Sequence, residues 1–405
     1  MHRIVSFGEI MLRLKSPAHE RFFQSPVLEA SFGGGEANVA VSLALLGESA
    51  AFVSALPDNP VGESALRELR RYSVDCQAIK RAKGRLGIYF LETGANQRPS
   101  NVVYDRDGSC ISAVKPGDFN WTEILKGADW FHTTGITPAL SQSLADATLE
   151  AIKAAKAAGI SVSIDLNYRK KLWNYGKKAP EIMRELASYA DLIIANEEDV
   201  QMCLGLEPEN TDVGAGKLDS EQYRLLAEKV KREFPGLKAV AITLRESRSA
   251  DKNGWSAILH GASGFQVSRA YDIDDIVDRV GGGDSFSAAL IYGLLNYGGD
   301  EAKALEFAVA ASALKHAIPG DFNLSAKAEI DALMGGNACL SAVIRLLFIA
   351  GNGTERHTSL TGTHGFGKRA RPPGRARDEG IAQPCRERIG RAYTPARIRR
   401  RLPRR

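Results

Sequence analysis

The segment 278–286 reads DRVGGGDSF and leads into an apolar helical pattern late in the chain. Glycines before a helix start let backbone N–H groups turn toward an anion, and the helix N-terminus adds partial positive charge there. Gly281, Gly282 and Gly283 therefore predict a phosphate cradle. Asp284 follows directly, where a carboxylate is placed to take a proton from an attacking hydroxyl. For this motif alone, an aspartate that only caps the helix is the alternative.

A second glycine run, 31–38, reads SFGGGEAN and opens another helical pattern early in the chain. Gly34 and Gly35 would let a polyol lie against the backbone, and Asn38 can both donate to and accept from sugar hydroxyls. Taken alone, this run is better explained as a flexible loop before a helix. Neither run is a Walker A loop, because no Lys-Ser/Thr pair follows, and neither is the GxGxxG of a dinucleotide fold.

Short apolar strands alternate with longer helices around these two runs. Strands are expected at 4–7, 51–55, 130–133, 161–165, 192–195 and 239–243. Helices are expected at 37–46, 63–72, 142–158, 179–188, 221–234, 284–295 and 301–317. This alternation predicts βαβ units and an α/β fold in which a mostly parallel sheet is covered on both faces. Ligands then sit beyond the carboxyl ends of the strands.

One segment breaks this alternation. Residues 84–112 show no helical pattern and predict two strands joined by a turn that contains Gly, Asn and Pro. Short strands within 11–32 are expected beside them. Together these strands predict a small β-lid that projects from the α/β body.

The two glycine runs together resemble the two signature patterns of the PfkB, or ribokinase-like, sugar kinases over residues 1–337. The resemblance implies a three-layer sandwich, ATP and Mg²⁺ as cofactors, Asp284 as general base and an anion hole at 281–284. The second family pattern usually reads DTxGAGD, whereas this chain has Arg279 for Thr and Gly282 for Ala. Both changes leave the backbone cradle intact.

Further stretches are similar to those family members that phosphorylate 2-keto-3-deoxygluconate, namely 8–9, 165–169, 196–199 and 319–321. By this resemblance the sugar acid would contact Gly34, Gly35, Asn38, Tyr89, Tyr104, Arg106, Arg169, Asp284 and Asp321. Arg106 on the lid and Arg169 after a middle strand also offer two guanidiniums, which suit a carboxylate better than a neutral hexose. A pair of surface arginines is the alternative.

The expected reaction is therefore ATP-dependent phosphorylation of 2-keto-3-deoxygluconate to 2-keto-3-deoxy-6-phosphogluconate. A neutral-sugar kinase of the same family, such as a fructokinase or ribokinase, is one alternative. A sugar-acid sensor without catalysis is another, disfavoured by the intact Asp284 and its glycine cradle.

Nucleotide contacts are expected from residues that follow the strands and from the late glycine run: Asn167, Asn196, Thr243, Arg245, Ser247, Gly281 and Gly283. The family usually has a TLGxxG turn where this chain reads TLRESR (243–248), which leaves the adenine contacts open. Arg245 is placed to reach phosphate instead. Asn196 with Glu198 or Asp199 resembles the family's NxxE motif, and Glu198 and Asp199 are expected to contact Mg²⁺ through water.

Charge divides the chain at residue 337. The first 337 residues carry 37 basic and 44 acidic side chains, whereas 338–405 carries 15 Arg, one Lys and four acids, a net charge of +12. The two expected regions are thus a kinase domain at 1–337 and an Arg/Pro/Gly-rich tail at 338–405. Composition without periodicity favours a disordered or non-native extension over a nucleic-acid-binding arm.

The cysteine pattern and the apolar stretches predict the cellular compartment of the protein. The five cysteines are scattered, without CxxC spacing, which favours a reducing environment and argues against a disulfide framework or zinc site. The apolar stretch 340–350 is interrupted by Arg345 and is too short to span a bilayer. A cytoplasmic enzyme is expected, with a sugar acid and ATP as its partners and no membrane association. The resemblance also allows a homo-oligomer.

Overall fold

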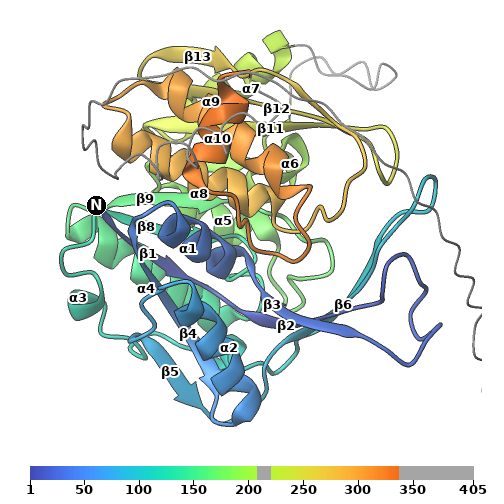
Figure 1. The fold of residues 1–405 in the computed structure, drawn as a ribbon. Coiled ribbons are helices and arrows are strands. Elements are labelled where there is room, and N and C mark those ends of the chain that lie inside the picture. The colour runs from blue at the N-terminus through green and yellow to red at the C-terminus, as the bar shows by residue number, and fades with distance from the viewer. Residues whose placement is uncertain (208–219, 337–405) are drawn as a thin grey trace, which may run out of the picture. The chain divides into compact units, whose positions relative to one another are not determined.

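The computed structural model describes residues 1–207 and 220–336, which form two β-sheets and the helices that cover the larger one (Figure 1). The predicted α/β class, with a mostly parallel central sheet and a small separate sheet, is confirmed. The expected tail at 338–405 lies outside the described residues, so the division at 337 stays a prediction.

The large sheet has ten strands in the described part of the chain, nine of them in the order β13-β12-β11-β10-β9-β8-β1-β4-β5, with β14 paired to β12. Their bounds are β1 Arg3–Phe7, β4 Ser49–Pro57, β5 Ile79–Ala82, β8 Trp130–Thr134, β9 Ser161–Asp165, β10 Leu192–Ala195, β11 Ala239–Ser247, β12 Asn253–Gly261, β13 Gly264–Val267 and β14 Tyr271–Ile273. The strands from β5 to β11 in this order are parallel, and β12 is antiparallel to its three neighbours. The carboxyl ends of the parallel strands therefore meet at one edge.

Helices cover both faces of this sheet. On one face lie α1 Gly35–Leu45, α2 Pro60–Arg71, α8 Gly282–Asn296, α9 Glu301–Lys315 and α10 Lys327–Met334. On the other lie the 3₁₀ turn η1 Ile111–Ala113 and helices α3 Trp121–Ile124, α4 Gln142–Ala157, α5 Ala179–Ala187, α6 Glu197–Leu204 and α7 Ser220–Glu233. The expected three-layer arrangement follows from these two positions of the helices.

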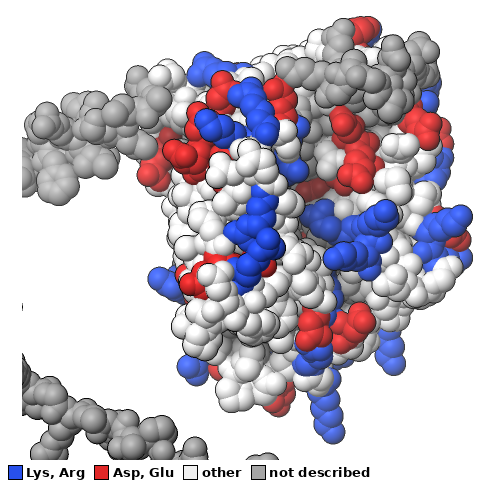
Figure 2. Space-filling model, turned by 90° about the vertical axis from the view of Figure 1, so that its right-hand side faces the viewer, with Lys and Arg blue, Asp and Glu red and all other residues white. Residues whose placement is uncertain are grey.

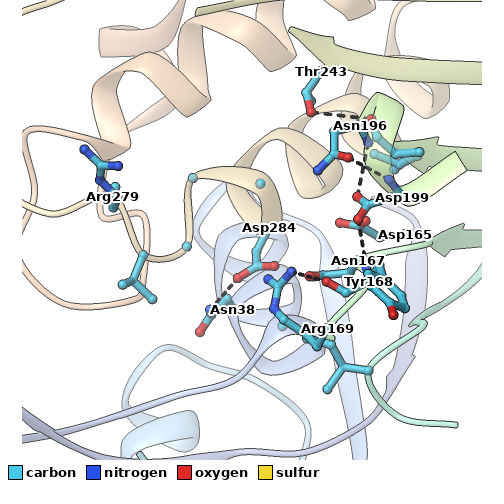
Figure 3. Close-up of a pocket in the computed structure, with 18 of the residues that line it drawn as sticks. Asn38, Asp165, Asn167, Tyr168, Arg169, Asn196, Asp199, Thr243, Arg279 and Asp284 are labelled. Atoms are coloured by element: carbon cyan, nitrogen blue, oxygen red, sulfur yellow. Dashed lines mark hydrogen bonds between the residues drawn. The ribbon is translucent and has the colours of Figure 1, made fainter. Parts of the chain in front are cut away.

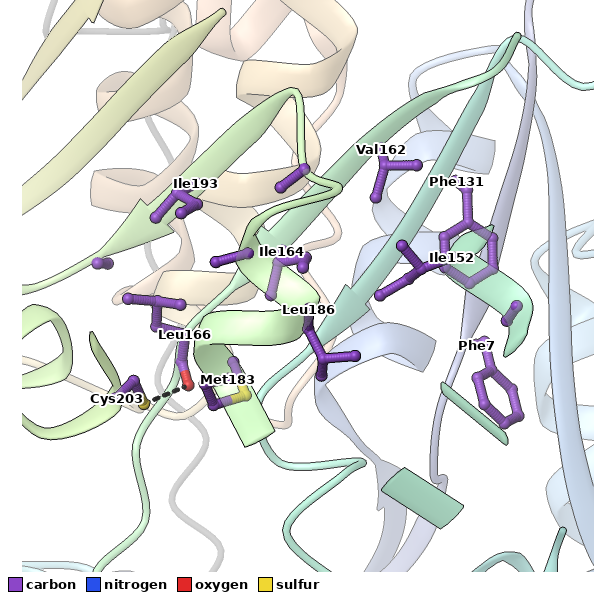
Figure 4. Packing of buried hydrophobic residues seen from close by; sticks show 14 of the residues in the cluster. Phe7, Phe131, Ile152, Val162, Ile164, Leu166, Met183, Leu186, Ile193 and Cys203 are labelled. Atoms are coloured by element: carbon purple, nitrogen blue, oxygen red, sulfur yellow. Dashed lines mark hydrogen bonds between the residues drawn. The ribbon is translucent and has the colours of Figure 1, made fainter. Parts of the chain in front are cut away.

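Successive side chains along each strand point to opposite faces of the sheet and so pack into two separate cores. In β1, Ile4 packs with the α1 and α8 side, whereas Val5 packs with the α4 and α5 side. Figure 4 shows the second core, to which Phe131 and Ile164 of the sheet and Ile152 of α4 belong. Each such side chain, once fully buried, contributes about 1.5–3 kcal/mol through its apolar area. Burial on both faces is the reason these strands read as continuous apolar runs.

The small sheet has the order β3-β2-β6-β7, with bounds β2 Met11–Lys15, β3 Glu29–Gly33, β6 Ile88–Glu92 and β7 Asn101–Asp105. It extends to one side of the large sheet (Figure 1). Met11, Tyr89 and Leu91 form a small buried cluster on it, and Tyr89 lies directly opposite Tyr104. This sheet is the expected β-lid.

Several elements were not expected from the sequence. The strands β12, β13 and β14 extend the sheet beyond β11, and α6 and α10 are short helices of eight residues each. Of the helices in the described residues, none is long and apolar enough to cross a membrane. Cys76, Cys110 and Cys203 are buried free thiols.

Candidate active site

The helices α1 and α8 begin next to each other, although their sequences are far apart. Asn38 in the first turns of α1 donates its side-chain N–H to Asp284 Oδ2 at 2.6 Å, across 246 positions of sequence. The Asn38 oxygen accepts the backbone N–H of Gly34 at 3.1 Å, which fixes the orientation of the amide. The two glycine runs therefore form one site, and Asp284 has a defined orientation in it.

Asp284 is almost fully buried, with 9% of its surface exposed. Burial raises the pKa of its carboxyl to about 7, although the Asn38 hydrogen bond and Arg169 act in the opposite direction. Asp321 and Glu36 add negative charge nearby and raise the pKa further. A carboxylate with a pKa near neutrality is well matched to accept a proton from an alcohol.

The glycine run before α8 presents unpaired N–H groups. Gly281 has a φ of 85°, and a Cβ there would lie 2.0 Å from the Asp321 carbonyl oxygen, so only glycine fits. The Gly282 N–H donates to the Arg279 carbonyl at 3.3 Å and belongs to the turn. No hydrogen bond forms at the N–H groups of Gly283 and Asp284 within 1–207 and 220–336. Within the expected anion hole at 281–284, the Gly282 N–H is therefore already used by the turn, and the hole itself stays a prediction.

These groups open onto a cleft of about 630 Å³ beyond the carboxyl ends of β9, β10 and β11. Lys and Arg side chains gather beside a hollow on the face from which the small sheet extends (Figure 2). All the residues that the sequence singled out line this cleft: Gly34, Gly35, Asn38, Tyr89, Tyr104, Arg106, Asn167, Arg169, Asn196, Glu198, Asp199, Thr243, Arg245, Ser247, Gly281, Gly282, Gly283, Asp284 and Asp321. The structure therefore brings them together, and their individual roles stay predictions.

Asp321 and Tyr89 are held in a buried network that the sequence did not reveal. Arg13 of β2 donates to Asp321 at 2.7 Å and also to Asp278, and the Tyr89 hydroxyl donates to Asp321 at 2.5 Å. Burial disfavours the charge on Arg13, but Tyr89, Asp321 and Asp278 outweigh it and raise its pKa. Alternation in β2 places Arg13 on the same face as buried Met11, which was the available signal. Asp321 thus forms part of the wall of the cleft with its charge already paired.

Arg106 also has a partner already. Its Nε donates to Glu9 Oε2 at 2.8 Å, Nη2 donates to the same oxygen, and each side chain is only 4% exposed. The guanidinium also lies 5.5 Å from the centre of the Tyr104 ring. Arg106 therefore enters the cleft as half of a buried ion pair, and its expected contact with a substrate carboxylate stays a prediction.

Three other guanidiniums have no carboxylate within ion-pair distance in the described part of the chain. Arg169 is exposed and points toward Asp284, and Arg279 lies on the other side of the glycine run (Figure 3). Burial lowers the pKa of Arg245, and the positive charges of Arg279 and Arg169 lower it further. Three cations in one cleft without acidic partners among the described residues suit negatively charged ligands. Arg279 was seen in the sequence only as a departure from a pattern.

The two expected metal contacts differ in their surroundings. One oxygen of Asp199 accepts the backbone N–H of Asn196 at 3.1 Å in the capping box of α6, and the other accepts the backbone N–H of Tyr168 at 2.9 Å. Glu198 is exposed at the cleft. Among the described residues no three His, Cys, Asp or Glu side chains group closely enough to hold a metal ion. Glu198 is therefore the better placed of the two to meet an ion through water.

Comparisons with known proteins agree on one family. The sequence profile described as pfkB family carbohydrate kinase matches residues 1–321. The crystal structure of 2-dehydro-3-deoxygluconokinase from Thermotoga maritima is 48% identical to this chain, with a TM-score of 0.78, over 83% of this chain and 100% of the other. A 2-dehydro-3-deoxygalactonokinase from Haloferax volcanii is 33% identical over 83% of this chain and 98% of its own length. The 2-dehydro-3-deoxygluconokinase of Bacillus subtilis is 27% identical over 79% and 91%.

Proposed function

Since this chain belongs to the pfkB family of carbohydrate kinases, we propose that it transfers the γ-phosphate of ATP to the terminal hydroxyl of 2-keto-3-deoxygluconate. This sugar acid is the 2-dehydro-3-deoxygluconate after which the Thermotoga and Bacillus relatives are named. The resemblance noted in the two glycine runs is confirmed at the level of the family, and the chain is a carbohydrate kinase. The product, the roles of the residues and the nucleotide contacts belong to the proposal.

One observation carries the mechanism: burial raises the pKa of Asp284 to about 7 at the start of α8, where the N–H groups of Gly283 and Asp284 have no hydrogen-bond partner among the described residues. Asp284 takes the proton of the sugar hydroxyl as that oxygen attacks phosphorus in line. The N–H groups of Gly283 and Asp284, with the positive end of α8, stabilise the charge on the transferred phosphoryl oxygens. Asn38 holds Asp284 in place through the 2.6 Å hydrogen bond.

We assign the binding of the nucleotide to the part of the cleft that holds Arg245 and Arg279. Arg245 and Arg279 line the cleft and have no carboxylate within ion-pair distance among the described residues, so they would hold the phosphates of ATP. Mg²⁺ prefers phosphate and water oxygens with one or two carboxylates, which fits exposed Glu198 at this end. Such an ion, when bound, supplies charge neutralisation on the phosphates.

We assign the binding of the sugar acid to the end of the cleft that holds Arg169 and the Arg106–Glu9 pair. Arg169 is exposed to the cleft and lies near Asp284, so a substrate carboxylate can approach it without displacing another acid. The small sheet would close over this end and exclude water, which prevents hydrolysis of ATP. The Haloferax relative favours a second candidate substrate, the galactonate counterpart, which differs from the gluconate only in the configuration of a hydroxyl-bearing carbon.

An ADP-release assay with purified protein tests the proposal. The panel contains 2-keto-3-deoxygluconate, 2-keto-3-deoxygalactonate, fructose and ribose, each with ATP in the presence and absence of Mg²⁺. The gluconate acid should give the highest kcat/KM, and NMR of the product should place the phosphate on the terminal oxygen. A higher kcat/KM for fructose or ribose would contradict the acid assignment. ADP release from none of the four would contradict the proposed reaction.

A further inference from the structure

A buried lysine lies directly behind the glycine run. Lys315, the last residue of α9, has 0% of its surface exposed. Its Nζ donates to the carbonyl oxygen of Ile318 at 2.9 Å and to that of Asp278 at 3.4 Å. No carboxylate lies within ion-pair distance of Nζ among the described residues. Burying an ammonium ion costs free energy. A buried lysine whose ammonium group has two backbone carbonyls as its only partners in the described part of the chain is therefore unusual.

The end of α9 fixes the loop that becomes the phosphate cradle. The Ser312 hydroxyl donates to the Gly282 carbonyl at 2.7 Å. The carbonyl of His316 accepts the N–H groups of Val277 at 2.9 Å and Asp278 at 3.2 Å. The Cε of Lys315 lies 3.3 Å from the position that a Cβ on Gly281 would take. One helix end therefore holds the backbone of this loop at several points.

The end of α9 binds carbonyl groups of the 278–283 loop, and this fixes the direction in which the N–H groups of the loop point. In a trans peptide, the C=O of one residue and the N–H of the next point in opposite directions. Ser312 binds the Gly282 carbonyl, so the N–H of Gly283 is turned away from α9. A Cβ on Gly283 would meet nothing within 4 Å, and Gly283 lines the cleft. Lys315 acts in the same way on the Asp278 carbonyl at the start of the loop.

We propose that Lys315 is a positioning residue for phosphoryl transfer, whose ammonium group holds the 278–283 loop and places a fixed positive charge behind the phosphate-binding N–H groups. The proposal rests on the proposed function, because it concerns the same cradle. Burial lowers the pKa of Lys315; of the charges that face it, Asp278, Asp321 and Asp284 favour its ammonium form, and Arg13 opposes it. An apolar side chain in its place would leave the Asp278 and Ile318 carbonyls without a donor.

The test is Lys315→Met, which keeps an apolar stem and removes the ammonium group. We expect kcat to fall about tenfold to a hundredfold, the effect of a small displacement of groups that must be aligned for reaction. The KM for the sugar acid should change by less than about twofold, since the sugar end is untouched. Ammonium chloride should restore part of kcat by filling the vacated position between the two carbonyls. Sodium chloride at the same ionic strength should not.

Lys327→Met is the matched control, because Lys327 lies on the neighbouring helix α10, is partly exposed and pairs with Asp331. Its kcat should equal that of the wild type. Lys315→Gln keeps hydrogen-bond donors without charge and should fold with an intermediate kcat. An unchanged kcat in Lys315→Met, or equal effects of ammonium and sodium, would overturn the proposal. Loss of the folded state in both Lys315 variants would overturn it as well, in favour of a purely structural lysine.

The outcome is separable from that of the proposed function. If the wild type releases no ADP with any sugar, amide hydrogen exchange of the peptide spanning 278–286 provides the readout. Exchange should be faster in Lys315→Met than in the wild type and should slow when ammonium is added. Identical exchange in the two proteins would refute the positioning role, whatever reaction the enzyme catalyses.

Discussion

Arg106 and Glu9 form a buried ion pair that joins the small sheet side of the cleft to the end of the first strand of the large sheet. Nε of Arg106 donates to Glu9 Oε2 at 2.8 Å, and the second oxygen of Glu9 is buried without a hydrogen-bond partner among the described residues. A substrate carboxylate that binds Arg106 must therefore share the guanidinium with Glu9. This relationship makes Arg106 and Arg169 unequal, although the sequence presented them as a pair.

Replacing Arg106 should affect both folding and substrate choice. Arg106→Met leaves Glu9 as an unpaired buried carboxylate, which typically destabilises a protein by about 3–5 kcal/mol. The double variant Glu9→Gln/Arg106→Met should recover most of this loss in a urea denaturation experiment. If Arg106 also binds the substrate acid, kcat/KM for the acid should remain about tenfold to a hundredfold below wild type in the double variant, the size of a lost charged hydrogen bond. Full recovery of activity would mean that Arg106 serves only the fold.

Arg169→Met should have the cleaner effect on specificity, because Arg169 is exposed and bonds only the Tyr168 carbonyl within the described residues. The melting temperature should stay close to wild type, as expected of an exposed side chain. For 2-keto-3-deoxygluconate, kcat/KM should fall about tenfold to a hundredfold through the loss of one charge-assisted contact. Fructose serves as the neutral control, and its low kcat/KM should hardly change. Equal losses for both sugars would place Arg169 at the phosphates instead.

Asp284→Asn tests the general base. The amide keeps the size of the side chain and can still accept from Asn38, but it cannot take a proton, so kcat should fall about 10²–10⁴-fold. Isothermal titration should show ATP and sugar binding close to wild type. A kcat above about a tenth of wild type would identify Asp284 as a helix cap without a role in proton transfer.

The raised pKa of Asp284 predicts a pH dependence of activity and of stability. Its pKa is about 7 in the folded protein against an ordinary value of 3.8. As pH rises through about 7, kcat/KM should increase and then level off, because only the carboxylate accepts a proton. Stability changes in the opposite direction. The folded state holds this proton more tightly, so its contribution is fully present below 3.8 and is lost as pH rises toward 7.

Urea denaturation at pH 5 and pH 8 separates this contribution from those of other buried acids. Asp284→Asn lacks the titration, so its stability relative to wild type should be higher at pH 8 than at pH 5. The same difference at both pH values would show that Asp284 titrates normally in the folded protein.

Arg245 and Arg279 are expected to act on the nucleotide. Arg245→Met and Arg279→Met should each raise the KM for ATP about tenfold or more, the loss of one charged contact to phosphate, and leave the KM for the sugar acid nearly unchanged. Arg248→Met is the matched control, since Arg248 lies just beyond β11 but pairs with Asp272 at 2.8 Å on the exposed surface. An exposed pair of this kind contributes only about 0–1 kcal/mol. If the KM for the sugar acid rises instead, these arginines bind the sugar acid and not the nucleotide.

Much of the fold could be predicted because its signals are local. Apolar runs bounded by polar residues marked the strands from β1 to β11 that form the cleft edge, and parallel pairing then required their carboxyl ends to meet. The phosphate cradle could also be predicted from a local signal, namely the glycine runs before two helices. The antiparallel strands β12 and β14 could not be recognised, because the register of β12 depends on pairing with β11 and that of β14 on pairing with β12. The helix α6 is short and is defined mainly by the Asn196–Asp199 capping box.

The sequence by itself determined which residues gather at the cleft, because strand ends and helix starts place them there whatever their partners. Only the tertiary structure decided what each can do. The buried position of Asp284 beside Asn38, the pairing of Arg106 with Glu9 and the place of Lys315 behind the cradle all depend on contacts between distant segments. Desolvation and ion pairing are set by whatever three-dimensional packing brings within a few ångströms, and neither is encoded in the spacing of residues along the chain.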